Sequence, residues 1–245
     1  MPSVAVFVLV HGAWNGAHGF HLVRRRLWAA GHEAFTPSLT GLGERVHLTG
    51  PGVGVSTHVH DVVNHVLYED HRDMVLVGFS YGGAVVTAAL PHIADRISHL
   101  VYLDAFVPAD GDSVMALIGL PAPGPITLGQ PWLVPGPQRS FDDPAESAFA
   151  QPRRVEHPAR CFSEPIDVPR PLEDYPFTRT YIRATADPPD APGARAFAGA
   201  AEHARTSAAW TQHYVASSHM IPQNRPDELV ALLLDLVEPS ATPAT

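Results

Sequence analysis

The segment Gly78-Phe-Ser-Tyr-Gly82 places one serine between two glycines, after the strand-forming run Val75–Val77 and before the helix-compatible run Ala84–Leu90. A serine on so sharp a strand-to-helix turn holds its hydroxyl exposed, and glycines leave room for the close approach of the flanking backbone. The helix that follows directs its free N–H groups and its positive dipole end toward the hydroxyl. The pattern predicts Ser80 as the nucleophile of a covalent mechanism.

A serine hydroxyl needs a base that takes its proton at neutral pH, and a histidine oriented by a carboxylate performs this task. Two further loops that follow predicted strands carry such groups, Asp187 and His219. The chain order Ser80, Asp187, His219 then predicts a catalytic triad above the carboxyl ends of a parallel sheet. Asp104, which also ends a predicted strand, and Asp190 are the alternatives for the acid.

The first apolar run, Val4–Val10, ends in His11-Gly12-Ala13. Glycine at the end of a strand can leave backbone N–H groups directed at a site. We therefore expect the N–H groups of Ala13 and Tyr81 to form an oxyanion hole for the intermediate of attack by Ser80.

Periodicity and turn residues predict an α/β fold with a mostly parallel twisted sheet and helices on both faces. The strand predictions are 4–10, 31–37, 75–77, 96–103, 177–184 and 208–215. The helix predictions are 17–30, 56–69 with Ser56 or Thr57 as cap, 84–90, 194–203 and one from Pro226. The tail from Glu238 is expected to be disordered.

The strand–helix alternation breaks between residues 109 and 177. Thirteen of the 25 prolines lie between Pro121 and Pro176, a density that excludes central strands. The segment also carries too many aromatic and aliphatic residues for a linker. We predict a cap inserted at 109–177, with short helices near 113–118 and 144–150, into an α/β core formed by 1–108 and 178–245.

Composition narrows the function classes. The 245 residues contain 16 basic and 25 acidic side chains, a net charge of −9, which disfavours nucleic-acid and anionic-membrane partners. Lysine is absent, so Schiff-base chemistry on a lysine is excluded. A single cysteine, Cys161, fits a reducing, cytoplasmic location and is expected to be a small buried hydrophobe. The apolar start at Val4–Val10 is interpreted as a strand and not as a signal peptide.

Three histidines, His58, His60 and His65, lie on the predicted helix 56–69. Their spacing is not that of a zinc-binding His-Glu-x-x-His helix, and acidic partners at the right spacing are missing. We interpret them as solvated or capping residues and expect neither a metal nor another cofactor.

These motifs together resemble the α/β-hydrolase group that contains plant methyl-ester esterases and plant hydroxynitrile lyases. The resembling segments are 7–13, 31–45, 78–83, 100–108, 181–187 and 218–220, which run the length of the core. The resemblance implies the α/β-hydrolase fold and the same triad, Ser80, Asp187 and His219. It does not extend to residues 121–176.

Two positions separate the esterases from the lyases of this family. The lyases have a threonine after the first strand's histidine and, after the catalytic histidine, a lysine that stabilises departing cyanide. This chain has Gly12 and Met220 there, as the esterases do. A neutral thioether cannot hold a cyanide anion, so the resemblance favours ester hydrolysis.

The leading hypothesis is a serine esterase that acts on a small, largely apolar carboxylic ester, with Gly12, Trp14, Phe106, Trp132 and Met220 in contact with the substrate. The alternatives are a non-hydrolytic lyase, including one that acts on a natural-product intermediate, and a ligand-binding member without catalysis. The partner is then a small-molecule ester, with neither nucleic acid nor membrane involved. A homodimer is compatible with the sequence. The sequence does not indicate the size of the substrate.

Overall fold

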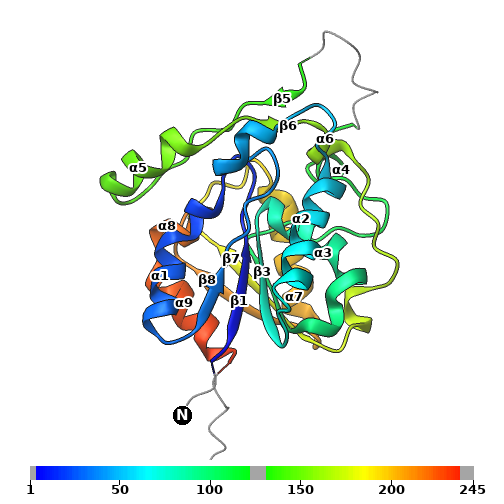
Figure 1. The fold of residues 1–245 in the computed structure, drawn as a ribbon, viewed down its shortest axis with the longest axis vertical. Helices are drawn as coiled ribbons and strands as arrows, with labels where there is room; N and C mark the ends of the chain where they lie inside the picture. The colour runs from blue at the N-terminus through cyan, green and yellow to red at the C-terminus, as the bar shows by residue number, and fades with distance from the viewer. Residues whose placement is uncertain (1–3, 122–130, 238–245) are drawn as a thin grey trace, which may run out of the picture.

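A computed structural model describes residues 4–121 and 131–237 of the chain. A six-stranded parallel sheet crosses its centre in the order β2-β1-β3-β4-β7-β8 (Figure 1). The strands are β1 (Val6–Val10), β2 (Glu33–Phe35), β3 (Met74–Phe79), β4 (Ile97–Leu103), β7 (Thr178–Ala184) and β8 (Thr211–Val215). Because all six run in one direction, their carboxyl ends lie at one edge of the sheet.

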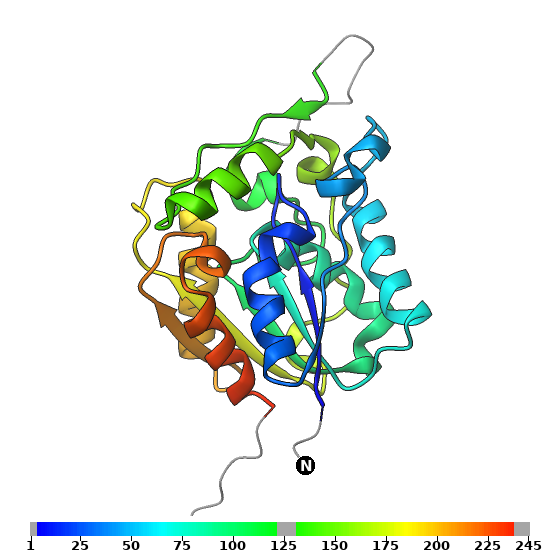
Figure 2. The same ribbon diagram turned by 60° about the vertical axis from the view of Figure 1, so that its left-hand side comes forward.

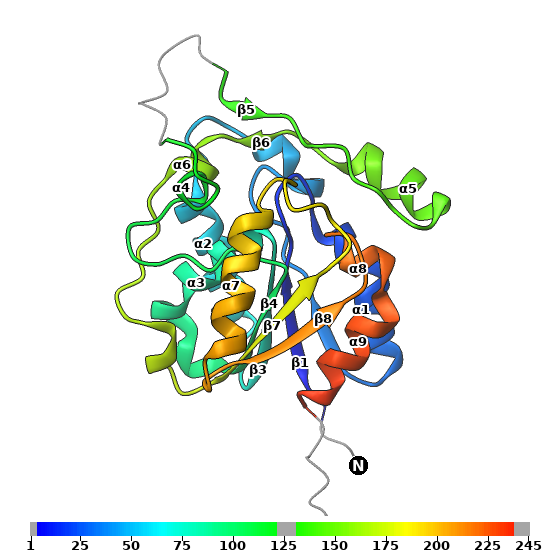
Figure 3. The same ribbon diagram turned by 180° about the vertical axis from the view of Figure 1, so that it is seen from behind.

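Helices cover both faces of this sheet. On one face lie α1 (His21–Ala29), α8 (Ile221–Asn224) and α9 (Pro226–Asp235). Figure 2 shows α1 in blue and α9 in red, which contact each other. On the other face lie α2 (Val55–Tyr68), α3 (Tyr81–Ile93) and α7 (Ala194–Thr206), of which α7 is nearest the viewer in Figure 3. Short 3-10 helices occupy Ala17–Phe20, Gly43–Leu48, Ala94–Arg96, Gln151–Arg153 and Leu172–Asp174.

The strands divide their side chains between two cores. Leu9, Val77 and Val101 pack against α1 and α9, while Val8 and Leu76 pack against α2 and α3. All six residues of β3 are buried. A strand buried on both faces requires a continuous apolar sequence, which explains why the run before Ser80 shows no alternation of apolar and polar residues.

Between β4 and β7 the chain leaves the sheet. The described parts of residues 109–177, here called the cap segment, form α4 (Val114–Leu117), β5 (Leu133–Val134), α5 (Pro144–Ala150), β6 (His157–Pro158) and α6 (Arg160–Ser163). Strands β5 and β6 pair antiparallel. Much of this segment lies across the carboxyl ends of the sheet strands in Figures 1 and 3. It therefore covers the edge at which Ser80 is expected.

Most predicted elements agree with the structure to within a few residues, but three details differ. Helix α2 begins at Val55 with Gly54 as its N-cap, and Thr57 Oγ1 accepts the N–H of Gly54 at 3.4 Å. Ser56 instead contacts Glu164 of α6. The four-residue helix α8 was missed, since Pro222 and its neighbours carry no helical periodicity. The predicted disordered tail from residue 238 lies outside the described residues.

Within the described ranges, each helix is too short or too polar to cross a lipid bilayer.

The end of β1 lies directly against the start of α3. A Cβ atom at Gly82 would lie 2.4 Å from the carbonyl oxygen of Val10 and 2.8 Å from that of His11. These are backbone atoms of a buried strand end, so they cannot move aside without displacing the loop that follows β1. Glycine at position 82 therefore sets how closely this loop approaches the helix after Ser80.

We expect Gly82→Ala to lower the free energy of unfolding by about 1–3 kcal/mol, because the added methyl group overlaps buried backbone. Urea denaturation monitored by circular dichroism would measure the loss. Gly52→Ala is the matched control, since a Cβ at Gly52 meets no atom within 4 Å. Equal stability of the two variants would contradict the proposed contact.

Candidate active site

Ser80 lies on a strained turn between β3 and α3. Its backbone angles are φ 54° and ψ −118°, a conformation that non-glycine residues rarely adopt and that costs on the order of 1–3 kcal/mol. The turn is fixed by hydrogen bonds, because the N–H of Ser80 donates to Leu103 O at 3.1 Å and its carbonyl accepts from the N–H groups of Gly83 and Phe106, each at 3.1 Å. Two of these three bonds, those with Leu103 and Phe106, are to residues beyond the turn, so the surrounding fold maintains the strain.

The side chain of His219 lies within hydrogen-bond distance of this serine. His219 follows β8, and its Nε2 is 2.9 Å from Ser80 Oγ. The other ring nitrogen, Nδ1, is 2.6 Å from Asp104 Oδ2. A carboxylate accepts, so Nδ1–H donates to Asp104 and the Nε2 lone pair is free to accept the hydroxyl proton. The structure thus brings together the predicted nucleophile and the predicted base.

The imidazole of His219 is almost completely buried between two aromatic rings. Phe197 stacks on it with 5.2 Å between ring centroids and an interplanar angle of 6°, and Phe79 lies at 4.8 Å. Burial lowers the pKa of His219 below its usual 6.5, and the hydrogen bond to Asp104 opposes this shift. The ring is therefore neutral at neutral pH, as a general base must be.

The carboxylate on the ring of His219 is Asp104, so the prediction that Asp187 contacts the ring differs from the structure. Asp187 Oδ2 instead accepts the backbone N–H of His219 at 2.7 Å. The physical reason is the strand order. Asp104 follows β4, the immediate neighbour of β3, whereas Asp187 follows β7, one strand further from Ser80. The second alternative, Asp190, makes no contact with the ring among the described hydrogen bonds.

Asp104 is fully buried, and several donors stabilise its charge. Besides His219 it accepts hydrogen bonds from the Arg183 guanidinium and, at 3.2 Å, from the N–H of Ala184. Its φ of 42° is the same kind of strained conformation as that of Ser80. The sequence analysis did not identify Arg183 as a site residue. Its position near the carboxyl end of the predicted strand 177–184 could have indicated a cation close to the site. A buried carboxylate would need such a cation.

The loop after β1 lies against the predicted nucleophile, Ser80. A Cβ at Gly12 would be 2.9 Å from Ser80 Cβ, so only glycine allows this approach. His11 Nε2 accepts the N–H of Leu39 at 3.1 Å, which leaves Nδ1–H to donate to Gly12 O at 2.9 Å. Complete burial lowers the pKa of His11 to about 3, so it stays neutral and acts as a structural clamp. The loop that carries Ala13 is thereby held beside Ser80.

The two predicted oxyanion donors lie close to Ser80 along the chain or in the adjoining loop. Ala13 follows Gly12 in this loop, and Tyr81 is the first residue of α3. Among the hydrogen bonds of the described residues, neither backbone N–H has a protein acceptor. The two groups are therefore available to an oxygen that develops negative charge next to Ser80.

Two adjoining cavities open at Ser80. The smaller one, here called the recess, has a volume of about 10 Å³, which corresponds to about one water molecule. It is lined by Gly12, Ala13, Trp14, Asn15, Phe79, Ser80, Arg139, Arg154, His219 and Met220. The larger one, here called the apolar cavity, has about 300 Å³. It is lined by Trp14, Ser80, Phe106, Val114, Met115, Ile118, Leu120, Val134, Arg139, Ala159, Phe162, Pro192, Gly193 and Phe197.

Of the predicted substrate contacts, Gly12, Trp14 and Met220 line the recess, and Trp14 and Phe106 line the apolar cavity. Trp132 lines neither, and its carbonyl instead accepts the N–H of Ala159 within the cap segment. The expectation for Trp132 rested on the apolar character of the residue alone, and such a residue can equally serve to hold the cap segment together.

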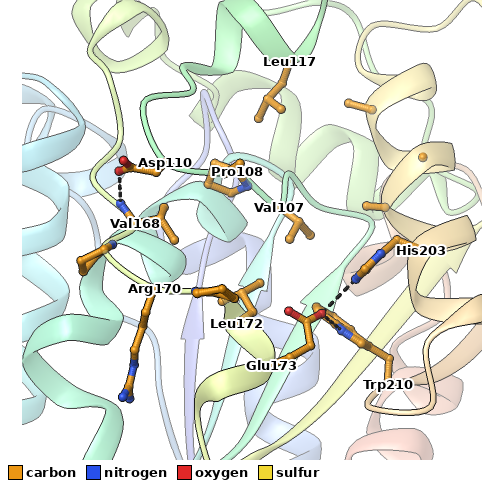
Figure 4. Close-up of a pocket in the computed structure, with 16 residues that line it drawn as sticks. Val107, Pro108, Asp110, Leu117, Val168, Arg170, Leu172, Glu173, His203 and Trp210 are labelled. Carbon is orange, nitrogen blue, oxygen red and sulfur yellow. Dashed lines mark hydrogen bonds and ion pairs between the residues drawn. The ribbon is translucent and has the colours of Figure 1, made fainter.

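A larger cleft of about 730 Å³ lies elsewhere, between the cap segment and α7 (Figure 4). Three of its polar side chains, those of Glu173, His203 and Trp210, contact one another. Glu173 Oε1 accepts from Trp210 Nε1 at 2.8 Å and lies 2.9 Å from His203 Nε2, as Figure 4 shows. This cleft shares no lining residue with the two cavities at Ser80, so size alone does not identify the reactive site.

His58 is buried and is neither solvated nor a helix cap, contrary to the prediction. Its Nε2–H donates to Thr40 O and its Nδ1 accepts the hydroxyl of Tyr81, both at 2.9 Å. Burial lowers its pKa to about 4. His58 therefore fixes Tyr81, the residue after the nucleophile. His60 is exposed and His65 half-buried.

Potential metal-ligand atoms of His58, His157 and Cys161 lie within 4.8 Å of one another. The lone pairs needed for a metal are already used, since His157 Nδ1 accepts the N–H of Trp14 at 3.2 Å and His58 Nδ1 accepts from Tyr81. Burial raises the pKa of the Cys161 thiol to about 12, so the thiol keeps its proton. The expectation that Cys161 is a small buried side chain agrees with its position.

Comparison with known proteins places these features in a family. The pattern of the alpha/beta hydrolase family matches residues 7–232. A carbendazim hydrolyzing esterase of Nocardioides sp. is 50% identical over 115 residues, 47% of this chain and 48% of that protein. An alpha-hydroxynitrile lyase of Arabidopsis thaliana is 31% identical over 108 residues, 42% of this chain and 40% of that protein. The matched stretches thus span less than half of each of these relatives.

Similarity in three dimensions extends over nearly the whole chain. The crystal structure of a methylesterase from Arabidopsis is 25% identical and superposes with a TM-score of 0.76, covering 96% of this chain and 99% of that one. The arrangement of Ser80 on a strained strand–helix turn of a parallel sheet is the arrangement that defines the fold. Because the family pattern spans most of the sequence, this protein belongs to the alpha/beta hydrolase family.

Proposed function

We propose that this protein is a serine hydrolase that cleaves a small, largely apolar carboxylic ester through an acyl-enzyme. The observation that carries the proposal is the continuous hydrogen-bonded chain from Ser80 Oγ through His219 to Asp104, with distances of 2.9 and 2.6 Å. A nucleophile, a neutral base and a buried carboxylate in contact are the requirements for activating a serine hydroxyl.

In the first half of the reaction, Ser80 Oγ attacks the ester carbonyl carbon and transfers its proton to His219 Nε2. The carbonyl oxygen takes the electron pair and receives hydrogen bonds from the N–H groups of Ala13 and Tyr81. Asp104 stabilises the imidazolium. When the tetrahedral intermediate collapses, the C–O bond to the alcohol breaks and the leaving oxygen takes the proton from His219.

In the second half, His219 removes a proton from water, and the resulting hydroxide attacks the acyl carbon. The bond from carbon to Ser80 Oγ then breaks, Ser80 regains a proton from His219, and the carboxylic acid leaves. The net reaction consumes one ester and one water and yields one acid and one alcohol.

The sizes of the two cavities support a proposal for which part of the substrate each cavity holds. The recess accommodates about one water-sized group, while the apolar cavity accommodates a substantially larger body. We infer that the small alkoxy portion occupies the recess and the acyl portion the apolar cavity. A methyl ester of an apolar acid fits this division.

A non-hydrolytic lyase on the same scaffold is a second candidate, and one observation favours it. Met220 and the absence of lysine disfavour a lyase, but Arg139 and Arg154 also line the recess. An arginine can stabilise a departing anion as a lysine does. Reaction in water enriched in oxygen-18 separates the two candidates, because only hydrolysis places the heavy oxygen in the acid product.

Ser80→Ala is expected to reduce hydrolysis of a methyl ester of an apolar acid by at least about 1,000-fold, because the acyl-enzyme cannot form. A fluorophosphonate probe should label the wild-type chain and not this variant. Ser163→Ala is the matched control, since that hydroxyl donates only to Arg160 O on the cap segment. Unchanged turnover in Ser80→Ala would refute the mechanism, and failure of the probe on the wild type would favour a ligand-binding protein.

Asp104→Asn is expected to reduce kcat by about 10³–10⁴-fold, since an amide cannot stabilise the imidazolium or select the required tautomer. Asp187→Asn should lose less than about tenfold, because an amide oxygen still accepts the N–H of His219. Steady-state kinetics on both variants test this order, with circular dichroism to confirm that each is folded. The reverse order would restore Asp187 as the acid of the triad.

The pH dependence of kcat/KM should reflect His219. The protonated ring cannot accept the serine proton, so activity is expected to fall as pH decreases through the pKa of His219. Since burial lowers this pKa, the midpoint should lie below 6.5. A profile of kcat/KM measured with a neutral ester tests this prediction, and a midpoint above 7 would contradict it.

A further inference from the structure

The apolar cavity contains one ionic side chain. Its lining, all of it from the described residues, consists of aromatic, aliphatic and small residues except for Ser80 and Arg139. Arg139 also lines the recess, so its side chain lies at the junction of the two cavities and beside the reactive serine. A single cation in an apolar wall next to the nucleophile is a feature that a purely apolar substrate would not use.

Arg139 is partly buried without a close anionic partner. Burial lowers the pKa of its guanidinium, while the charges of Asp187 and Asp104 raise it. Neither carboxylate forms an ion pair with it, since in the described part of the chain Asp104 pairs with Arg183 and His219. Burying an arginine is unfavourable unless an anion or several acceptors satisfy it. Among the described residues no acceptor is hydrogen-bonded to this guanidinium, so an anion at the junction would stabilise it.

A second cation reinforces the positive potential. Arg154 lines the recess as well, and the one hydrogen bond of its guanidinium among the described residues runs from Nη2 to Pro137 O at 3.4 Å. Burial and the neighbouring Arg139 lower its pKa to about 10. Two like charges beside one small space repel each other, and an anion bound by Arg139 from the side of the apolar cavity relieves part of this repulsion.

The backbone holds this arrangement in place. Gln151 Nε2 donates to the carbonyl of Arg139 at 2.7 Å, and Arg154 contacts Pro137. The loop that carries Arg139 and the 3-10 helix next to Arg154 are therefore tied together. Guanidinium groups on tied segments form a preorganised site, which lowers the entropy lost when a ligand binds.

We propose that Arg139 is a specificity residue that receives a carboxylate of the substrate from the side of the apolar cavity, while Arg154 strengthens the positive potential from the recess. This inference rests on the proposed ester hydrolysis at Ser80 and names its substrate class, which is an ester with an apolar body and one carboxylate a few bonds from the scissile carbonyl. Half-esters of dicarboxylic acids have this chemistry. The guanidinium offers paired donors that match a carboxylate, and the rest of the acyl chain lies in the apolar cavity.

The test compares monomethyl esters of straight-chain dicarboxylic acids, from succinate to adipate, with the corresponding dimethyl esters. The wild type is expected to favour the best monoester over its neutral counterpart by about 10–100-fold in kcat/KM, and added salt should raise KM for the monoesters alone. Arg139→Gln should raise KM for the monoester by about 10–100-fold and change the dimethyl ester by less than about threefold. Arg139→Lys should recover part of the loss, because it restores the charge.

Arg153→Gln is the matched control. It removes the same charge from the residue next to Arg154, but Arg153 stacks on Phe149 and donates to Phe149 O, away from the recess. It should leave both substrates unchanged. A direct measurement uses Ser80→Ala, to which glutarate should bind at least tenfold more tightly than to Ser80→Ala carrying Arg139→Gln in titration calorimetry.

The outcomes separate the inference from the proposed function. If dimethyl esters are hydrolysed through Ser80 but monoesters are not preferred, the specificity proposal is overturned and the esterase stands. If Arg139→Gln lowers the turnover of both substrates equally, Arg139 acts on the reaction itself and the proposal is also overturned. If neither ester is hydrolysed, the proposed function fails, and glutarate binding to Ser80→Ala then decides whether the anion site stands by itself.

Discussion

The candidate site depends on the imidazole of His219, which must be buried and still be able to accept a proton. Two aromatic rings, Phe79 and Phe197, exclude water from His219 and disfavour its charged form. A carboxylate at 2.6 Å favours that same form. Neither effect alone suffices, because a ring buried without the carboxylate would be too weak a base, and a paired but solvated ring would be charged too readily. Asp104 can supply the carboxylate only because Arg183 and the N–H of Ala184 satisfy its own buried charge.

The order of the strands decides which carboxylate takes this place. Strands β3 and β4 are neighbours, so the residue after β4 lies next to the residue after β3, and Ser80 N–H donates to Leu103 O, the residue before Asp104. Asp187 comes from the next strand outward and reaches the backbone of His219. The two carboxylates therefore have different roles. Asp104 orients the ring of His219, and Asp187 holds the loop that carries this ring. A loop held in this way keeps the ring within reach of a serine that the fold has already strained into position.

The parts of this site that follow local rules could be predicted from the sequence. Ser80 and Gly82 belong to one strand–turn–helix, and His219 follows a clear strand, so their roles depend on residues close to them in the chain. The acid could not be chosen in this way, because Asp104 and Asp187 both end strands and only the sheet order distinguishes them. The buried place of His58 was missed because an apolar helix face does not reveal the hydroxyl of Tyr81 on another helix. The substrate contacts depend on how the cap segment packs, and its many prolines erase the periodicity that would indicate which side chains point inward.

Arg139 also connects recognition with catalysis. Its positive charge is among the influences that lower the pKa of His219, because a cation near an imidazole disfavours a second positive charge. A substrate carboxylate paired with Arg139 would cancel much of that influence. The imidazole would then become a stronger base when the anionic substrate is in place than when the cavity holds water or a neutral ester. Under this proposal the carboxylate contributes to more than affinity, since the same neutralised charge that holds the substrate also favours transfer of the serine proton. Such a coupling requires the guanidinium to be close to both the ligand and the base, and its place at the junction of the recess and the apolar cavity meets that requirement.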